Sequence, residues 1–398
     1  MNKVKIGVFG AGRGETMISY CTHAQNAELV AVCDRNETLL ENIRKKEGCD
    51  GVAFYHDFEE FLGHDMDAVV LANYATEHAG YAVRCLEAGL HVLSEVLPCQ
   101  TLAEAVRLVE AVEKSDKIYA YAENYCFMAA PMEMRRLYRE GKLGQFEYGE
   151  GEYLHNCESI WSEITQDNPE HWRNRMPASF YCTHSIGPLL HITGLRPRTV
   201  SVFELPYSAR CGRMGMQGTT AAVEMITLEN GAVIKSVHGC GIARNSVWYS
   251  VYGSLGRMES AREDAEQGDV GRIYVNLDEN EGGNQCKVVS YEPEDELSRA
   301  AKEYGHGGSD YYTMWNFAEK ILGNPDTDVI DVYEALDMGL PGVIAYRSLQ
   351  NHNAAVEIPD LRDPAQRDLY RNDTACTDPE KAGAMLVPSY VSGNLGAK

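Results

Sequence analysis

The feature that most constrains this chain is a glycine-rich turn between two apolar runs near its start. The first run covers residues 5–9 and leads into Gly-Ala-Gly-Arg-Gly at 10–14, and residues 16–21 have the composition of a helix. A second apolar run, over 29–33, ends at Asp34. A strand, a glycine turn, a helix and a strand that ends in an acid make up a dinucleotide-binding unit, so we predict such a unit here.

Each residue of this unit has a physical role toward a dinucleotide. Gly10 permits the tight turn, Gly12 lets the backbone approach a pyrophosphate, and the helix start after Gly14 offers free N–H groups to the phosphates. Gly14 stands one residue earlier than the third glycine of the usual spacing. Asp34 can accept hydrogen bonds from both ribose hydroxyls and repels a 2′-phosphate, which favours NAD over NADP. Arg35 favours NADP instead, because an arginine next to this acid can accommodate the 2′-phosphate.

Composition narrows the class of partner. The 398 residues allow two or three domains, and the 36 basic and 59 acidic residues give a net charge of −23, which argues against nucleic acid and anionic membranes as partners. The chain has no long apolar run and no signal-peptide pattern, so we expect neither a membrane span nor export. The twelve cysteines include no Cys-x-x-Cys pair, which favours reduced thiols in the cytoplasm and no metal site.

The first third of the chain alternates strand and helix patterns. After the dinucleotide unit come strands over 67–72, 91–95 and 118–122, with helices over 76–88 and 101–115 between them. This alternation predicts a Rossmann domain of the α/β class over residues 1–123, with a doubly wound parallel sheet. Ligands of such sheets bind at the carboxyl ends of the strands. The residues at those ends are Gly10, Asp34, Asn73, Glu95 and Glu123.

The pattern changes after residue 144, where strands follow one another with few helices between them. The expected strands are 146–154, 200–205, 220–228, 232–238, 246–253 and 272–277, and the expected helices are 311–322 and 332–349. We therefore predict an α+β domain over residues 124–363 with a large open, mainly antiparallel sheet. The polar segment 364–398 is expected to be an arm or a tail.

Reactive side chains gather in three segments of the second domain, 151–158, 170–173 and 180–191. Tyr153 and His155 are two residues apart and share one face of a strand. Tyr181 and His184 share one face if their segment is helical, and a tyrosine and a histidine so placed could share proton transfer. A helical histidine is more often a structural partner than a catalyst, so both interpretations stay open.

Several of these segments resemble the glucose–fructose oxidoreductase/inositol dehydrogenase superfamily, whose members pair a Rossmann domain with an open-sheet substrate domain. The markers are the glycine loop, 73–78, 86–92 and 331–337. Most members carry Glu-Lys-Pro after the strand at 91–95, and that lysine polarises the reacting hydroxyl. This chain has Glu-Val-Leu-Pro at 95–98, which argues against an ordinary sugar-dehydrogenase mechanism.

A branch of the superfamily that lacks this lysine works as NAD-dependent glycosidases, including α-N-acetylgalactosaminidases. The chain is similar to that branch at 123–126, 153–156, 172–173, 181–188 and 305–310. The resemblance implies a catalytic set of Tyr181, His184, Arg173, Glu123, Tyr153 and His155. The expected cofactor-binding set includes the glycine loop and comprises Gly10, Gly12, Arg13, Gly14, Asp34, Arg35, Asn73, His78, Glu95, Asn124 and Trp172.

The resemblance also implies a redox route to hydrolysis. Bound NAD⁺ oxidises C3 of a terminal sugar, a base removes the C2 proton, the C1 group is eliminated, water adds, and C3 is reduced again. His184 is expected to act at the C3 hydroxyl and Tyr181 at C2, with Arg173 favouring the phenolate. The ketone takes the place of the paired carboxylates of ordinary glycosidases.

Two other functions stay open: a net sugar 3-dehydrogenase or ketosugar reductase, and an NAD- or sugar-sensing protein without catalysis. The expected substrate is a small glycoside, although neither its sugar nor its anomeric configuration follows from the sequence. We also expect a homo-oligomer, because the free face of an open apolar sheet is usually buried against a partner.

Overall fold

The computed structural model describes residues 3–262, 270–278 and 288–391, and its contacts divide the chain into two compact units. The first unit combines Met1–Asn124, Glu296–Leu336 and Leu361–Asn372. The second combines Tyr125–Asp295, Asp337–Asp360 and Asp373–Lys398. The expected domains, 1–123, 124–363 and 364–398, are each one continuous stretch of sequence, whereas each observed unit combines three separate stretches.

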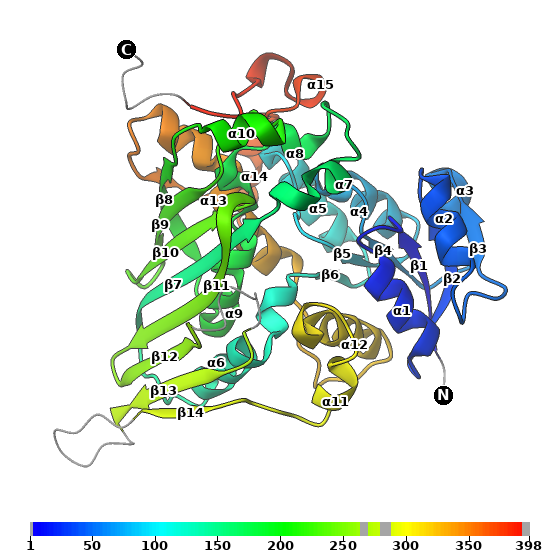
Figure 1. Cartoon of the computed structure of the whole chain (residues 1–398), viewed down its shortest axis with the longest axis horizontal. Coiled ribbons are helices and arrows are strands. Elements are labelled where there is room, and N and C mark those ends of the chain that lie inside the picture. Colours follow the sequence, from blue (N-terminus) through cyan, green and yellow to red (C-terminus); the bar gives the residue numbers. More distant parts are fainter. Residues whose placement is uncertain (1–2, 263–269, 279–287, 392–398) are drawn as a thin grey trace. The chain divides into compact units, whose positions relative to one another are not determined.

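The first unit contains the predicted parallel sheet (Figure 1). Its strand order is β3-β2-β1-β4-β5-β6, and every neighbouring pair is parallel. The strands are β1 (Val4–Phe9), β2 (Ala27–Cys33), β3 (Ala53–Tyr55), β4 (Ala68–Leu71), β5 (His91–Ser94) and β6 (Tyr119–Tyr121). This order brings the carboxyl ends of β1 and β4 together at the point where the winding reverses, which is where such sheets bind ligands.

The helices of the first unit follow from local signals in the sequence. Thr101 and Glu104 form the capping box that their spacing predicts, and Asn36 caps the next helix after β2 through its side chain. The helices are α1 (Glu15–His23), α2 (Glu37–Arg44), α3 (Phe58–Leu62), α4 (His78–Glu87), α5 (Leu102–Lys114), α11 (Ser298–Ala301), α12 (Ser309–Ile321) and α14 (Pro364–Tyr370).

Segments distant in sequence complete the core of this unit. Met314, Phe317 and Ala318 of α12 are buried in one cluster with the side chains of β1, β2 and α1. On α14, Arg367 donates two hydrogen bonds of 2.6 Å to the carboxylate of Glu113 on α5. These contacts explain why 296–336 and 361–372 belong to the same compact unit as the Rossmann sheet.

The second unit contains the predicted open sheet, with nine strands in the order β14-β13-β12-β11-β7-β10-β9-β8-β15. Only β7 and β10 pair in parallel, so the sheet is mainly antiparallel as predicted. The strands are β7 (Phe146–Asn156), β8 (Pro197–Glu204), β9 (Ala222–Leu228), β10 (Val233–Gly239), β11 (Gly241–Gly253), β12 (Gly256–Ser260), β13 (Ile273–Leu277), β14 (Val289–Tyr291) and β15 (Val356–Glu357).

Helices α6 (Ala129–Arg139) and α9 (Thr183–Thr193) pack against one face of this sheet. The other helices of this unit are α7 (Trp161–Thr165), α8 (Trp172–Arg175), α10 (Ala209–Met214) and α15 (Pro379–Ala382), while α13 (Val332–Gln350) spans both units. The start of α9 approaches the sheet closely at Gly151, where a Cβ atom would lie 1.8 Å from the Ser185 carbonyl oxygen. A glycine is therefore required on β7 at this point, and it fixes the height of α9 above the sheet.

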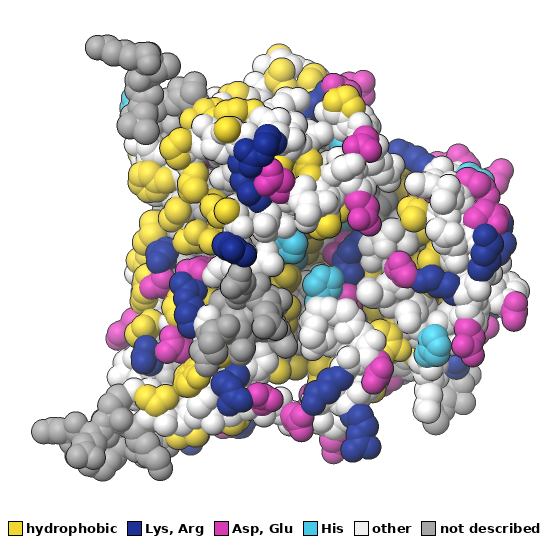
Figure 2. Space-filling view, in the orientation of Figure 1, with side chains coloured by type: hydrophobic (Ala, Val, Ile, Leu, Met, Phe, Trp, Pro, Cys, Tyr) yellow, Lys and Arg dark blue, Asp and Glu magenta, His cyan; other side chains and the backbone are white. Residues whose placement is uncertain are grey.

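The other face of the sheet has a hydrophobic area over β8, β9 and β10 and a charged area towards β7. Phe203, Val223, Val237 and Met225 project to this face from β8, β9 and β10, and Figure 2 shows hydrophobic side chains over these strands. Towards β7 the same face carries the Lys235–Glu150 ion pair.

The described residues contain eleven cysteines, all buried and without disulfides. Within the described segments no helix is long and apolar enough to cross a bilayer. The same segments contain no group of three or more His, Cys, Asp and Glu side chains that could hold a metal ion.

Candidate functional site

The glycine loop after β1 has the shape that a dinucleotide requires. Gly10 has φ +102°, and a Cβ atom there would lie 2.4 Å from the Ala72 carbonyl carbon. A Cβ atom at Gly14 would lie 2.3 Å from the Gly10 carbonyl oxygen, so the loop packs tightly on itself. A Cβ atom at Gly12 would meet nothing nearer than Leu39 at 3.7 Å, which leaves space for a ligand over the backbone.

Asp34 ties the end of β2 to this loop. One carboxylate oxygen accepts a hydrogen bond from the Ala11 N–H at 2.7 Å, and the other accepts from the Asn36 N–H at 2.8 Å. The neighbouring Arg35 is exposed, lies 3.7 Å from a Glu77 oxygen and donates to the Tyr81 hydroxyl at 3.2 Å. A carboxylate therefore offsets the positive charge that could attract a 2′-phosphate.

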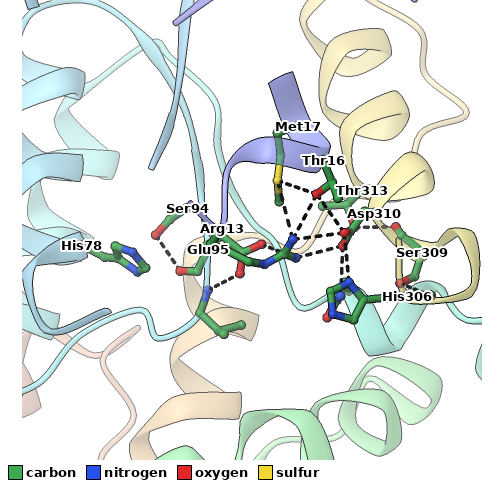
Figure 3. Close-up of polar contacts among 12 residues, drawn as sticks. Arg13, Thr16, Met17, His78, Ser94, Glu95, His306, Ser309, Asp310 and Thr313 are labelled. Carbon is green, nitrogen blue, oxygen red and sulfur yellow. Dashed lines mark hydrogen bonds and ion pairs between the residues drawn. The ribbon is translucent and has the colours of Figure 1, made fainter. Parts of the chain in front are cut away.

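Arg13 stands at the centre of a polar cluster (Figure 3). Its guanidinium makes two hydrogen bonds to the Asp310 carboxylate, of 2.9 and 3.1 Å, and lies 2.7 Å from a Glu95 oxygen. The paired arrangement is the geometry in which arginine binds a carboxylate most strongly. Arg13 is thus held by two acids of its own unit, which limits its role as a phosphate ligand.

Asp310, at the start of α12, gathers further donors. It accepts hydrogen bonds from Thr16 at 3.0 Å and Asn124 at 3.0 Å, and His306 Nδ1 lies 3.0 Å away. Burial alone would raise the pKa of this carboxyl, but the His306 hydrogen bond and the Arg13 charge outweigh burial and hold it well below its usual range. The sequence identified Asp310 only through its motif, and nothing local indicated its contact with Arg13.

The rim at β4 to β6 holds the other cofactor candidates. The Asn73 side-chain amide donates to Glu77 at 3.2 Å, while its buried side-chain oxygen Oδ1 has no hydrogen-bond partner among the described residues. The His78 ring lies between the Leu97 and Asn73 carbonyl oxygens at 3.1 and 3.3 Å, and burial lowers its pKa to about 4. His78 therefore braces two loops as a neutral ring, and Glu123 is fully buried after β6.

These features fit a dinucleotide. The loop is shaped by glycines that cannot carry side chains, Asp34 lies at the end of β2, and the Asn73 oxygen is available to a hydroxyl donor at the same rim. The predicted binding residues Gly10, Gly12, Gly14, Asp34 and Asn73 thus belong to one edge of one sheet.

The second unit brings the predicted catalytic rings together. The His184 ring centroid lies 4.5 Å from that of Tyr153 and 5.2 Å from that of Tyr181. The Tyr153 and His155 rings lie 6.0 Å apart on the same face of β7, as their spacing predicts. Tyr125 joins the cluster 4.6 Å from His184, although its only signal in the sequence was its place in the resembling 123–126 motif.

Arg173 supplies positive charge to this cluster. Its guanidinium carbon lies 4.5 Å from the Trp172 ring centroid and 5.7 Å from that of Tyr181. Burial acts to lower the pKa of Arg173, but interaction with Tyr181 and neighbouring thiols outweighs it, so the side chain stays charged. Burial raises the pKa of Tyr153 well above its usual value, so Tyr153 stays a neutral phenol.

Side chains of the sheet hydrogen-bond to the segment that carries His184. The buried Tyr249 hydroxyl donates to the His184 carbonyl at 2.5 Å. The Ser185 and Ser236 hydroxyls are 2.6 Å apart, and Ser236 contacts His238 Nδ1 at 2.9 Å. A hydrogen-bonded chain therefore connects the start of α9 to β10.

Glu224 lies at the end of this chain and is fully buried on β9. The nearer of its carboxyl oxygens is 3.9 Å from His238 Nε2. Burial raises the pKa of Glu224 to about 8, against a smaller opposing effect of the Cys182 thiol, and burial lowers the pKa of His238 to about 4. Both side chains are therefore uncharged near neutral pH, and no sequence pattern indicated this pair.

Comparison with known proteins extends these observations. Residues 4–123 match an oxidoreductase family with an NAD-binding Rossmann fold, and residues 293–365 match the C-terminal domain of glycosyl hydrolase 109. A glycosyl hydrolase family 109 protein of Phocaeicola vulgatus is 27% identical over 91% of this chain and 78% of its own length. Another, of Bacteroides thetaiotaomicron, is 25% identical over 91% of this chain and 85% of its own.

Solved structures share the fold at lower identity. The scyllo-inositol dehydrogenase of Lactobacillus casei, solved with NAD(H) and scyllo-inositol, superimposes with a TM-score of 0.69 at 18% identity. The match covers 90% of this chain and 99% of that one. Both units of the present chain therefore have the fold of that enzyme.

Proposed function

We propose that this protein is a glycoside hydrolase that works through bound NAD⁺. The proposal starts from a chain whose residues 4–123 match an oxidoreductase family with an NAD-binding Rossmann fold and whose residues 293–365 match a glycosyl hydrolase 109 C-terminal domain. The observation that carries the proposal is the ring cluster of Tyr153, Tyr181 and His184, with Arg173 beside Tyr181. Protein relatives named as glycosyl hydrolases support the substrate class.

The residues that would hold the cofactor are Gly10, Gly12, Asp34 and Asn73. When bound, NAD⁺ supplies a reversible hydride acceptor for C3 of a terminal sugar, and this acidifies the neighbouring C2–H bond. His184 takes up and returns the proton of the C3 hydroxyl. Tyr181 removes the C2 proton, because the charge of Arg173 favours its phenolate form.

The remaining polar side chains position the sugar. Tyr153, as a neutral phenol, donates a hydrogen bond to a sugar hydroxyl. His155 and Glu123 are assigned to sugar hydroxyls and to the water that adds at C1. Trp172 and Asn124 are assigned to the cofactor and not to the sugar.

A screen of aryl glycosides with the purified protein tests the proposal. Release of the aryl alcohol without accumulation of NADH is the expected result. NADH that accumulates in proportion to substrate, with the glycosidic bond intact, would instead establish a sugar 3-dehydrogenase, which the oxidoreductase match favours as the second candidate. Binding of NAD with no turnover of any glycoside or sugar would favour a sensing protein.

The cofactor preference follows from Asp34. We expect tighter binding of NAD⁺ than of NADP⁺, because Asp34 accepts from ribose hydroxyls and Glu77 offsets the charge of Arg35. In Asp34→Ala, NAD⁺ affinity should fall by roughly 1.5–3 kcal/mol and the preference should narrow or reverse. Titrations of both cofactors check this, with the exposed Asp50→Ala as control. Unchanged NAD⁺ affinity in Asp34→Ala contradicts the assignment.

We further propose that the protein is a homo-oligomer through the free face of the open sheet. Phe203 is 49% exposed there, beside Val223 and Val237. Phe203→Glu should shift the mass measured by light scattering toward the monomer, because it places a charge in the proposed interface between subunits. The control is Leu369→Glu, at an apolar side chain on α14 that is 76% exposed. A monomer mass for the native chain at micromolar concentration refutes the proposal.

A further inference from the structure

Two cysteines face each other where β7 ends and where β10 passes into β11. Asn156 pairs with Gly241 in antiparallel register, and the next residues, Cys157 and Cys240, continue the pair through a 3.3 Å hydrogen bond from the Cys157 N–H to the Cys240 carbonyl. Opposed residues in such a pair have Cα atoms about 4.5–5.5 Å apart. A disulfide requires about 4.4–6.8 Å, so this backbone can accept one.

The surroundings of this pair differ from those of the other thiols. Cys157 Sγ lies 2.9 Å from His155 Nδ1. The Cys157 thiol hydrogen-bonds to Cys240, which raises the pKa of Cys157 and lowers that of Cys240, and the charge of Arg173 favours both thiolates. Burial is the main cause that raises the pKa of Cys33 and Cys85 to about 12, and the charge of Asp34 adds to it at Cys33, so those thiols remain inert.

We propose that Cys157 and Cys240 form a modification site for small two-electron oxidants of the peroxide class, which close the pair to a disulfide beside His155. The Cys240 thiolate attacks one oxygen of hydrogen peroxide, breaks the O–O bond and becomes a sulfenic acid, and the hydroxide that leaves takes up the proton lost by the Cys240 thiol to give one water. The Cys157 sulfur then attacks that sulfur and expels the hydroxyl as a second water, with its thiol proton. Two thiols and one peroxide thus give one disulfide and two waters.

The disulfide changes the catalytic cluster as well as the thiols. It removes the contact between Cys157 and His155 and both thiols that interact with Arg173. We therefore expect loss of glycoside cleavage on oxidation and recovery with a dithiol reductant. This effect on activity rests on the proposed function, whereas the cross-link itself does not.

The test treats the native protein with hydrogen peroxide, quenches free thiols and maps peptides without reduction. We expect a peptide that joins Cys157 to Cys240 and a fall from twelve to ten titratable thiols. Cys240→Ser and Cys157→Ser should each abolish this peptide, whereas Cys211→Ser, at a buried thiol of α10, should keep it. Activity should fall in proportion to the cross-linked fraction and return on reduction.

Two outcomes overturn the proposal. One is over-oxidation of Cys240 to sulfinic acid without the cross-linked peptide, and the other is both thiols remaining free while others react. A cross-link that forms in a protein inert toward every glycoside would instead sustain the modification site and refute the proposed function, so the two failures are distinguishable.

Discussion

Tyr181→Phe and His184→Ala are each expected to lower turnover of an aryl glycoside by about 10²-fold or more, the usual scale for loss of a general acid or base. Tyr181→Phe keeps the ring packing at 5.2 Å from His184 and removes only the hydroxyl. NAD⁺ affinity should change little in Tyr181→Phe, which separates a chemical role from a structural one. The measurement is initial rates at saturating substrate together with a cofactor titration.

Tyr148→Phe is the matched control, because Tyr148 lies on the same strand as Tyr153 but stacks with Tyr252 on the other face. It should retain native turnover. A Tyr181→Phe protein that turns over as fast as this control contradicts the assignment of Tyr181.

The same cluster predicts where solvent hydrogen enters the product. On the proposed route Tyr181 removes the C2 proton in every turnover, so reaction in D₂O should place deuterium at C2 of the released sugar. Substrate that lacks a free 3-hydroxyl should be inert. Cleavage without C2 exchange excludes this route and indicates direct displacement by carboxylates.

The second large effect concerns stability and arises at Glu224. Its pKa is raised from the usual 4.5 to about 8 in the folded protein, so the stabilisation is fully present below pH 4.5 and is lost as pH rises toward 8. A shift of this size corresponds to roughly 5 kcal/mol of unfolding free energy. Glu224→Gln should therefore gain stability relative to the native protein as pH rises, because it cannot ionise.

Denaturant unfolding at pH 5 and at pH 8.5 measures this difference. Glu259→Gln, on the other face of the same sheet, is the control and should show no comparable pH-dependent gain. If Glu224→Gln and the native protein differ equally at both pH values, Glu224 does not carry the proton assigned to it. His238, with a pKa lowered to about 4, acts in the opposite direction and destabilises the fold as pH falls below 6.5.

Much of the fold was predictable because its strands leave strong patterns. Buried parallel strands such as β1 and β4 are continuous apolar runs, and the capping box at Thr101 marks the start of α5. The strands that sequence analysis missed, such as β3 and β14, have only three residues each, too few to show a period. Their formation depends on neighbours that offer hydrogen bonds.

The candidate site was predictable only in part. Spacing placed Tyr153 and His155 on one face, whereas Arg13 and Asp310 are 297 residues apart and no local pattern links them. Glu224 and His238 are ordinary polar residues in alternating strands, and only the tertiary fold buries them. Contacts made by distant segments, and the pKa shifts that follow from them, therefore required the structure.

The discontinuous first unit has a consequence for the growing chain on the ribosome. Residues up to 124 emerge with the whole Rossmann sheet, but Phe317 and Ala318 fill the same core and are made about 190 residues later. At ~5–20 residues per second this is an interval of roughly 10–40 s. During that time the face that α12 will cover is an apolar surface open to chaperones, so the N-terminal sheet reaches its full stability only when most of the chain has been synthesised.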